Sequence, residues 1–389
     1  MAKRETETAP MTMERVALIK NKRYGERTIT KGSTLKKRTP RIQTGIFAMT
    51  YATGGGYPLW MMSRLKGPEH GGKTSAALEA VKMTQVTCFR CLNIGRFCKC
   101  EEGPKLLDAA YCDIEGTLDR DWAECLGVDM DRLYLPNAGD GGEYLDIVDS
   151  LLQTDDCGVV VIDSVAQLLP PAEVERAIGD RQVGSLPKLL TDASAKLTMR
   201  LNLERRRGHP CFVICINQLR ADLGAGMFGN PETEAGGKSF KHWFALGLRI
   251  SKLSSKDVNN KTNIEDPDES FDLFQKHGFR VDKDKVWTIA KDGDFIRARA
   301  KVVHSKDNSR ILCKKGAIYD AELVMDFARK LGIIDDTKPG VYSVVKYDIK
   351  TRTIDEMVTM LMEDDELYYQ LQKLIVDRVW INKMEKENQ

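Results

Sequence analysis

The stretch Leu65-Lys-Gly-Pro-Glu-His-Gly-Gly-Lys-Thr-Ser-Ala-Ala-Leu78 carries the strongest structural signal in the sequence. Between Gly67 and Thr74 it fits the phosphate-binding pattern G-x-x-x-x-G-K-S/T. In that pattern the backbone N–H groups close around a polyphosphate, the lysine reaches the β- and γ-phosphates, and the hydroxyl ligates Mg²⁺. The apolar run before the glycines and the alanine-rich run after them predict a buried strand and a helix whose N-terminus faces the anion. A glycine-rich turn that matches by chance is the alternative.

The bulk composition is that of an ordinary globular protein. The chain has 389 residues, a formal net charge of +2, 42% hydrophobic and 30% charged residues, and this length predicts two or three domains of about 100–200 residues each. No run of about 18 apolar residues predicts a membrane span, and no apolar N-terminal segment predicts secretion. Six cysteines lie singly among apolar residues, a pattern typical of reduced thiols in a cytoplasmic protein.

The first 43 residues form a basic arm, with twelve Lys or Arg residues against four Glu. This charge suits a DNA phosphate backbone, although a solvated arm accounts for it equally well. Residues 12–24 are expected to form a short amphipathic helix, which either frays or docks on a neighbouring subunit.

Strand-like and helix-like segments alternate after residue 44, and this predicts a parallel sheet with helices on both faces. The strands are expected at residues 60–66, 109–114, 132–135, 158–163, 211–216 and 246–252. Residues 254–285 are polar without periodicity and are expected to form an exposed insertion. Further strand-like segments lie at residues 286–290, 295–304 and 310–313. From residue 317 onward a small α+β domain is expected, with helices at 319–331, 353–362 and 364–384 and a strand at 340–347.

Polar side chains end three of the predicted core strands. Asp163 ends an apolar run and can hold Mg²⁺ through water beside the phosphate loop. Glu115 is a candidate general base that would orient and deprotonate the water attacking a γ-phosphate; a helix-capping carboxylate is the alternative. Gln218 can contact a γ-phosphate and report its loss to the glycine-rich loop at residues 219–237.

Several stretches resemble RecA-family recombinases, and they occur in the order expected of that family. The run Met227-Phe-Gly-Asn-Pro-Glu-Thr233 is similar to the family's second DNA-binding loop, residues 173–184 resemble the first, and residues 67–74 resemble its phosphate loop. The resemblance covers about residues 43–389. It implies an α/β fold: a RecA-type P-loop ATPase core with a mainly parallel twisted sheet, an N-terminal subunit-docking arm and a small α+β C-terminal domain. The corresponding boundaries are 1–43, 44–316 and 317–389.

The resemblance also implies roles for the matching residues. Glu115, Lys73 and Gln218 would be catalytic, with Gln218 as the γ-phosphate sensor. Trp122 replaces an aromatic that stacks on adenine, and Lys188 replaces an arginine and lacks its bidentate fork. The residues expected to bind ATP and Mg²⁺ are Gly67, Pro68, Glu69, His70, Gly71, Gly72, Lys73, Thr74, Ser75, Asp119, Trp122, Asp163 and Lys306, with Thr74 and Asp163 at the metal. Those expected to face DNA are Gly184, Lys188, Arg220, Met227, Phe228, Gly229, Asn230, Gly236 and Gly237.

In the family, the neighbouring subunit supplies two lysines to the γ-phosphate. This sequence has Lys301-Val-Val-His304-Ser-Lys306 at that place, so His304 stands where a lysine is expected. Either Lys306 acts alone or Lys301 helps. The acidic tail of many relatives is missing, which implies less restraint on duplex DNA binding and mildly favours a phage source.

Cys88, Cys91, Cys98 and Cys100 lie in an expected insertion at residues 88–105. Their C-x2-C and C-x-C spacing could wrap a tetrahedral Zn²⁺, and a metal would stabilise a segment with few apolar residues. Two disulfides, four free thiols and an iron–sulfur cluster are the alternatives. The insertion is expected to contact DNA or the next subunit, and the sequence does not separate these two.

The combined expectation is a DNA-dependent ATPase that forms helical filaments on single-stranded DNA and exchanges strands with homologous duplex DNA. A hexameric helicase or DNA motor on the same fold is the alternative, although it would lack the run at residues 227–233. A non-catalytic, zinc-dependent assembly protein on DNA is a third possibility. The intact set of Lys73, Thr74, Glu115 and Asp163 argues against it.

Overall fold

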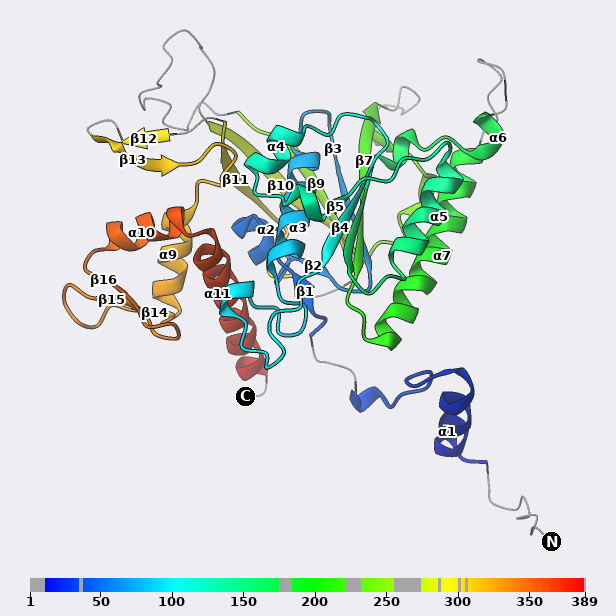
Figure 1. Cartoon of the computed structure of the whole chain (residues 1–389), viewed down its shortest axis with the longest axis horizontal. Coiled ribbons are helices and arrows are strands. Elements are labelled where there is room, and N and C mark those ends of the chain that lie inside the picture. The colour runs from blue at the N-terminus through cyan, green and yellow to red at the C-terminus, as the bar shows by residue number, and fades with distance from the viewer. Residues whose placement is uncertain are drawn as a thin grey trace.

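The computed structural model describes residues 11–34, 38–174, 176, 184–221, 232–254, 274–285, 288–299, 302–304 and 307–387. It has an α/β core, a small C-terminal unit beside it, and helix α1 (Met13–Tyr24) set apart near the N-terminal end (Figure 1).

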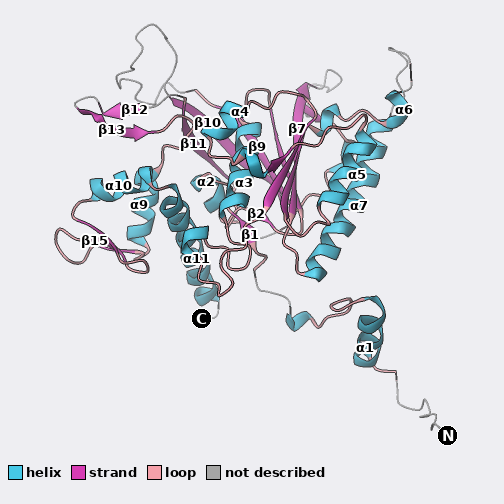
Figure 2. Ribbon diagram, in the orientation of Figure 1, coloured by secondary structure: helices cyan, strands magenta, loops and turns pink. Residues whose placement is uncertain are grey.

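A nine-stranded sheet forms the centre of the core (Figure 2). Its strands follow the order β11-β10-β9-β3-β7-β6-β4-β5, and β8 pairs with β7. Pairings from β9 to β5 along this order are parallel, whereas β10, β11 and β8 join antiparallel. The six predicted core strands are confirmed, and with them the mainly parallel sheet. The strand bounds are β3 Met62–Gly67, β4 Asp108–Asp113, β5 Leu133–Tyr134, β6 Cys157–Asp163, β7 Phe212–Ala221, β8 Glu232–Glu234, β9 Leu246–Lys252, β10 Phe274–Asp284 and β11 Asp292–Ala298.

Strand β6 shows how the sequence builds the two helical layers. Its residues are buried throughout, as a parallel strand covered on both faces requires. Val161 packs in one core cluster with helix α3 (Lys73–Val86), and Val160 packs in a second with α5 (Gly141–Leu151) and α7 (Ser185–Arg207). Shorter elements complete the core: α2 Phe47–Ala52, α4 Arg120–Cys125, α6 Pro171–Val174, α8 Gly237–Phe240, β1 Arg41–Ile42, β2 Tyr57–Pro58, and 3-10 turns at Gly32–Thr34, Gly95–Phe97, Met130–Arg132 and Val165–Gln167.

The C-terminal unit has the expected α+β character. A three-stranded antiparallel sheet packs with helices, and its apolar residues continue the cluster that covers α3. The predicted helices and the strand within 340–347 are confirmed. The bounds are α9 Ala321–Lys330, β14 Ile334–Asp335, β15 Tyr342–Val344, β16 Ile349–Thr351, α10 Ile354–Glu363 and α11 Asp365–Glu387.

Two sequence expectations between residues 254 and 304 are corrected. Residues 274–284 form β10 of the main sheet instead of an exposed insertion, and Phe274, His277 and Phe279 are buried. The remaining residues of that stretch, 255–273, lie outside the described part of the chain. No strand includes residues 288–290, where one was expected to end. The strand-like segments expected at residues 295–304 and 310–313 coincide with β11, β12 (Val302–His304) and β13 (Asp307–Cys313), and the last two form a separate antiparallel pair.

Helix α1 confirms the helix expected at residues 12–24. Thr12 caps it by accepting a hydrogen bond from the Arg15 backbone N–H at 3.2 Å. None of its residues is buried, and Met13 and Leu18 are largely exposed. Its role as a docking arm, and the domain boundaries at residues 43 and 316, stay predictions. Within the described ranges, no helix is both long and apolar enough to cross a membrane.

Candidate nucleotide-binding site and four-cysteine cluster

The phosphate loop is shaped by glycines that tolerate no side chain. At Gly67, the last residue of β3, a Cβ atom would lie 1.9 Å from the Ile250 carbonyl oxygen in β9. Gly72 has φ 94° and precedes α3 without a side-chain cap. A Cβ there would lie 3.0 Å from the ring of His277. The loop therefore forms a cradle of backbone groups at a helix N-terminus, which suits a polyphosphate.

Lys73, Thr74 and Asp163 come together at this cradle. Lys73 Nζ donates to the Pro68 carbonyl at 2.7 Å, and Thr74 Oγ1 donates to Asp163 Oδ2 at 2.8 Å. The Tyr111 hydroxyl, from β4, donates to the same carboxylate oxygen at 2.6 Å. Burial raises the pKa of Asp163 against the lowering effect of these two hydrogen bonds, and burial lowers the pKa of Lys73. Tyr111 is a site residue that the sequence reasoning missed.

Glu115 joins the ends of three neighbouring strands. Its Oε1 accepts hydrogen bonds from Ser164 Oγ at 2.7 Å and from Gln218 Nε2 at 2.8 Å. Ser164 follows β6, and Gln218 lies in β7. The two polar residues that were expected to sense and hydrolyse a γ-phosphate are thus in direct contact. Glu115 caps no helix in this arrangement.

The predicted adenine-binding residues lie at the start of α4. Asp119 is the N-cap and accepts a hydrogen bond from the Trp122 backbone N–H at 3.0 Å. Trp122 Nε1 donates to Ser75 Oγ in α3 at 3.0 Å, so the indole lies beside the phosphate-loop helix. Pro68, Glu69 and His70 are exposed in the loop between β3 and α3. Base stacking by Trp122 stays a prediction.

His277 in β10 is a second residue that the sequence reasoning missed. Its Nδ1 lies 3.0 Å from the Gly71 carbonyl oxygen. A carbonyl only accepts hydrogen bonds, so Nδ1 must carry the proton. Burial lowers the pKa of His277 to about 4, which keeps the ring neutral at neutral pH. The ring therefore supports the loop without adding charge to it.

The residues expected to face DNA are only partly described. Gly184 and Lys188, at the start of α7, and Gly237 are exposed, as contact with DNA requires. Gly236 is buried, and a Cβ atom there would lie 2.7 Å from the Phe240 ring. Arg220 lies in β7, and its side chain is not described. Met227, Phe228, Gly229 and Asn230 lie outside the described residues, as do Lys301 and Lys306.

A buried ion cluster ties the far end of the predicted DNA loop to β3. Glu234 in β8 accepts from Arg64 Nη1 at 2.5 Å and from Lys66 Nζ at 2.9 Å. Arg64 also pairs with Asp282 at 2.9 Å. Asn217 Nδ2 adds a hydrogen bond to the Ala235 carbonyl at 3.0 Å. Both ends of the loop are therefore fixed to strands that end at the phosphate cradle.

Comparison with known proteins agrees with this geometry. The family model described as the RecA N-terminal domain matches residues 12–267. The chain belongs to the RecA family. It is 32% identical over 318 residues to Protein RecA of Halalkalibacterium halodurans, which covers 80% of this chain and 77% of that protein. It is 29% identical over 385 residues to Protein RecA of Oceanobacillus iheyensis, with 95% and 96% covered. The predicted RecA resemblance and the RecA-type fold are confirmed.

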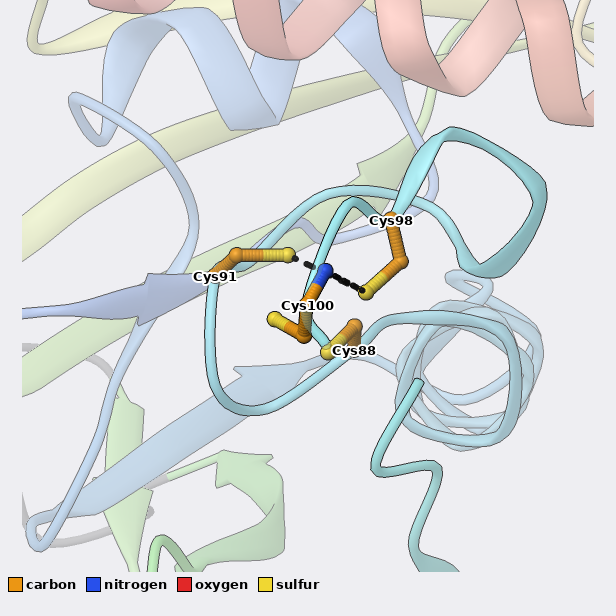
Figure 3. Close-up of side chains that lie close together, drawn as sticks. All are labelled: Cys88, Cys91, Cys98 and Cys100. Atoms are coloured by element: carbon orange, nitrogen blue, oxygen red, sulfur yellow. Dashed lines mark hydrogen bonds between the residues drawn. The ribbon is translucent and has the colours of Figure 1, made fainter. Parts of the chain in front are cut away.

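This RecA-family chain also carries a compact group of four thiols. The sulfurs of Cys88, Cys91, Cys98 and Cys100 all lie within 4.8 Å of one another, and their side chains converge on one centre (Figure 3). Four-coordinate Zn²⁺ with bonds of about 2.3 Å would separate its sulfurs by about 3.8 Å. The sulfurs of Cys91 and Cys98 are 3.7 Å apart. All ten cysteines are described and free, so no disulfide competes with a metal in this structure.

Backbone N–H groups favour the thiolate at Cys88, whereas the hydrogen bond with Cys98 raises the pKa of the Cys100 thiol. Burial raises the pKa of the Cys88 thiol, but backbone N–H groups, including that of Lys105 with N to Sγ at 3.4 Å, outweigh it and lower the pKa to about 6. The Cys100 N–H donates to Cys98 Sγ, also at 3.4 Å. Metals bind the thiolate, and such N–H contacts orient it. The number and spacing of the four thiols fit Zn²⁺.

Proposed function

We propose that this chain is an ATP-dependent recombinase that assembles into helical filaments on single-stranded DNA and exchanges strands with homologous duplex DNA. Membership of the RecA family supports this class of activity. The observation that carries the proposal is the hydrogen bond from Gln218 to Glu115 at 2.8 Å. It joins the phosphate cradle to β7, the strand that leads into the predicted DNA loop. Such a protein would act in the cytoplasm.

The cradle fits ATP with Mg²⁺. Thr74 and Asp163 offer the oxygen ligands that Mg²⁺ prefers, directly or through water, and a side chain at Gly67 would collide with the neighbouring backbone. Bound ATP would supply the γ-phosphoryl group for transfer to water. Lys73 would neutralise phosphate charge, and Glu115, oriented by Ser164, would align the attacking water and accept its proton. Asp119 and Trp122 would hold the adenine.

Coupling to DNA would run through both ends of the loop at residues 219–237. Gln218 would sense the γ-phosphate at one end, while Glu234 holds the other end to Arg64 and Lys66. Contacts to DNA would be mainly to phosphates and hence sensitive to salt. The residues proposed to face DNA are Gly184, Lys188, Arg220, Met227, Phe228, Gly229, Asn230, Gly236 and Gly237. In the filament, the next subunit would complete the ATP site with Lys306 and dock through residues 1–43.

The four-cysteine cluster is proposed to hold one structural Zn²⁺. The donor set and the sulfur spacing support this assignment. Mass spectrometry under native conditions should find one zinc ion per chain. Finding no metal in protein purified without chelator would remove the proposal.

Electron microscopy with ATP and single-stranded DNA tests the recombinase proposal most directly. Helical filaments that exchange strands are expected, whereas closed rings that unwind duplex DNA would favour the hexameric helicase. Lys73→Ala should abolish DNA-stimulated ATP hydrolysis. Lys196→Ala, at an exposed lysine of α7, is the matched control and should hydrolyse ATP normally. Retained hydrolysis in Lys73→Ala would overturn the nucleotide-site assignment.

A further inference from the structure

The four-cysteine loop, residues 88–105, lies against helix α11 of the C-terminal unit (Figure 1). The central contact is Gln370 of α11, which is fully buried. Its Oε1 accepts from the Ile94 backbone N–H at 3.0 Å, and its Nε2 donates to Asn93 Oδ1 at 3.1 Å. Nε2 also lies 2.6 Å from the Tyr347 hydroxyl. Separation of the loop from α11 would leave this buried amide short of partners, so the contact is specific.

Phe97 and Arg96 of the loop also contact the C-terminal unit. The Phe97 ring packs on Tyr347 with centroids 4.6 Å apart. Arg96 pairs with Asp364 at 2.6 Å. Arg96 is about half exposed, so this ion pair contributes little beside the buried contacts. The sequence predicts DNA or the next subunit as the partner of the loop. In the structure the loop contacts the C-terminal unit of its own chain.

The loop has no apolar interior of its own to preserve this shape. Phe89 faces the core, where its ring would lie 3.0 Å from a Cβ atom at Gly158 in β6. Ile94 is buried beside Gln370, and Phe97 faces Tyr347. Inside the loop, the four cysteine side chains lie close together (Figure 3). Backbone hydrogen bonds, such as that from the Cys88 N–H to the Asn93 carbonyl at 2.8 Å, shape the first turn of the loop. Metal ligation would join this turn to Cys98 and Cys100, and so hold the shape that presents residues 93–97 to α11.

We propose that the four-cysteine loop is a metal-dependent clamp that fixes α11, and with it the C-terminal unit, against the ATPase core. The proposal rests on the zinc site proposed above and adds its purpose. Metal holds the loop, and the loop holds Gln370 and Tyr347. On one face the sheet shares its apolar cluster with α11, which also packs on α2, so removal of the metal loosens α11 around Gln370 without detaching it, while the main sheet stays folded.

Hydrogen exchange of the full-length protein, measured peptide by peptide without nucleotide, tests the clamp. Zinc-loaded protein is compared with protein stripped by a chelator, and with Cys98→Ser, which lacks one ligand. Amides of α11 around Gln370 should exchange about tenfold faster or more in both, while amides of β6 should be unchanged. Cys125→Ser is the matched thiol control, because its hydroxyl can keep the bond to the Lys315 carbonyl. It should exchange like the wild type.

Gln370→Ala separates the clamp from the metal. This variant should still bind one zinc ion and yet show the faster exchange of α11. If zinc is bound and its removal leaves α11 unchanged, the clamp is overturned while the zinc site stands. If β6 exchanges faster to the same degree as α11, the metal supports the whole fold and the clamp is again overturned. If the protein binds no zinc, both proposals fail.

Discussion

The hydrogen bond from the Tyr111 hydroxyl to Asp163 should be among the contacts at the nucleotide site that contribute most to the free energy of unfolding. Tyr111→Phe removes the hydroxyl and keeps the ring, so the Asp163 carboxylate loses one of its two donors while Thr74 remains. Asp163 is only 6% exposed, so water cannot easily replace the lost donor. A bond to a charged acceptor contributes about 1.5–3 kcal/mol. We expect the free energy of unfolding at pH 7.5 to fall by roughly that amount.

Tyr57→Phe is the matched control for this prediction. Tyr57 is fully buried, and its hydroxyl has no hydrogen-bond partner among the described residues. Removal of an unsatisfied hydroxyl should be neutral or stabilising by up to about 1 kcal/mol. Urea unfolding of both variants measures the difference. A loss below about 0.5 kcal/mol in Tyr111→Phe, or an equal loss in both variants, would refute the role given to Asp163 as the acceptor of two strong hydrogen bonds.

Two further predictions concern buried carboxyl groups. Glu234→Gln leaves the buried Arg64 and the partly buried Lys66 to share the Asp282 carboxylate, so stability to urea should fall by roughly 3 kcal/mol. The exposed Glu102→Gln should change it by less than about 0.5 kcal/mol, and equal losses would contradict the buried cluster. Burial raises the pKa of Asp320 to about 7, against the lowering effect of the Tyr368 hydroxyl. The folded state thus favours the protonated acid, and this contribution to stability should be full below about pH 4 and decline as pH rises toward 7. Asp320→Asn should flatten that decline in unfolding measured from pH 4 to 8, and an unchanged slope would contradict it.

Much of the core could be predicted from the sequence, because the patterns that indicate it consist of residues close together in the chain. The residues of β6 are continuously apolar, and such a run is what a strand buried on both faces needs. The glycines at positions 67 and 72 mark a backbone turn whose reason, close contact with β9 and β10, is visible only in three dimensions. The sequence therefore predicts the phosphate cradle but not the neighbours that enforce it.

The strand and the site residues that the sequence did not predict share one physical cause: their partners lie far away in the chain. Strand β10 has buried residues in its first half and exposed charged residues in its second half, and such a mixture is also typical of a polar insertion. Tyr111 lies 52 residues from Asp163, and His277 lies 206 residues from Gly71. Gln370 lies 276 residues from Ile94. Periodicity carries no information about such pairings, since each side chain alone is an unremarkable member of its strand or helix.

Helix α3 connects the nucleotide site, the four-cysteine loop and the C-terminal unit. It begins with Lys73 in the phosphate cradle, and it ends two residues before Cys88. Between them Lys82, paired with Glu79, donates to the Tyr369 hydroxyl of α11 at 2.6 Å. Two adjacent buried residues of α11 are thus linked to α3: Tyr369 directly through Lys82, and Gln370 through the four-cysteine loop.

This double attachment predicts how nucleotide binding should reach the C-terminal unit. If phosphate binding shifts α3, then α11 should follow it closely while the loop is clamped, and less closely when Lys82 is the main link left. We therefore expect ATP to change hydrogen exchange in α11 of zinc-loaded protein, and to change it several-fold less after chelation. With zinc bound, Lys82→Met should also weaken the response of α11 to ATP, because it removes the direct link between α3 and α11. An ATP response in α11 that is equal with and without metal would show that the loop takes no part in this connection.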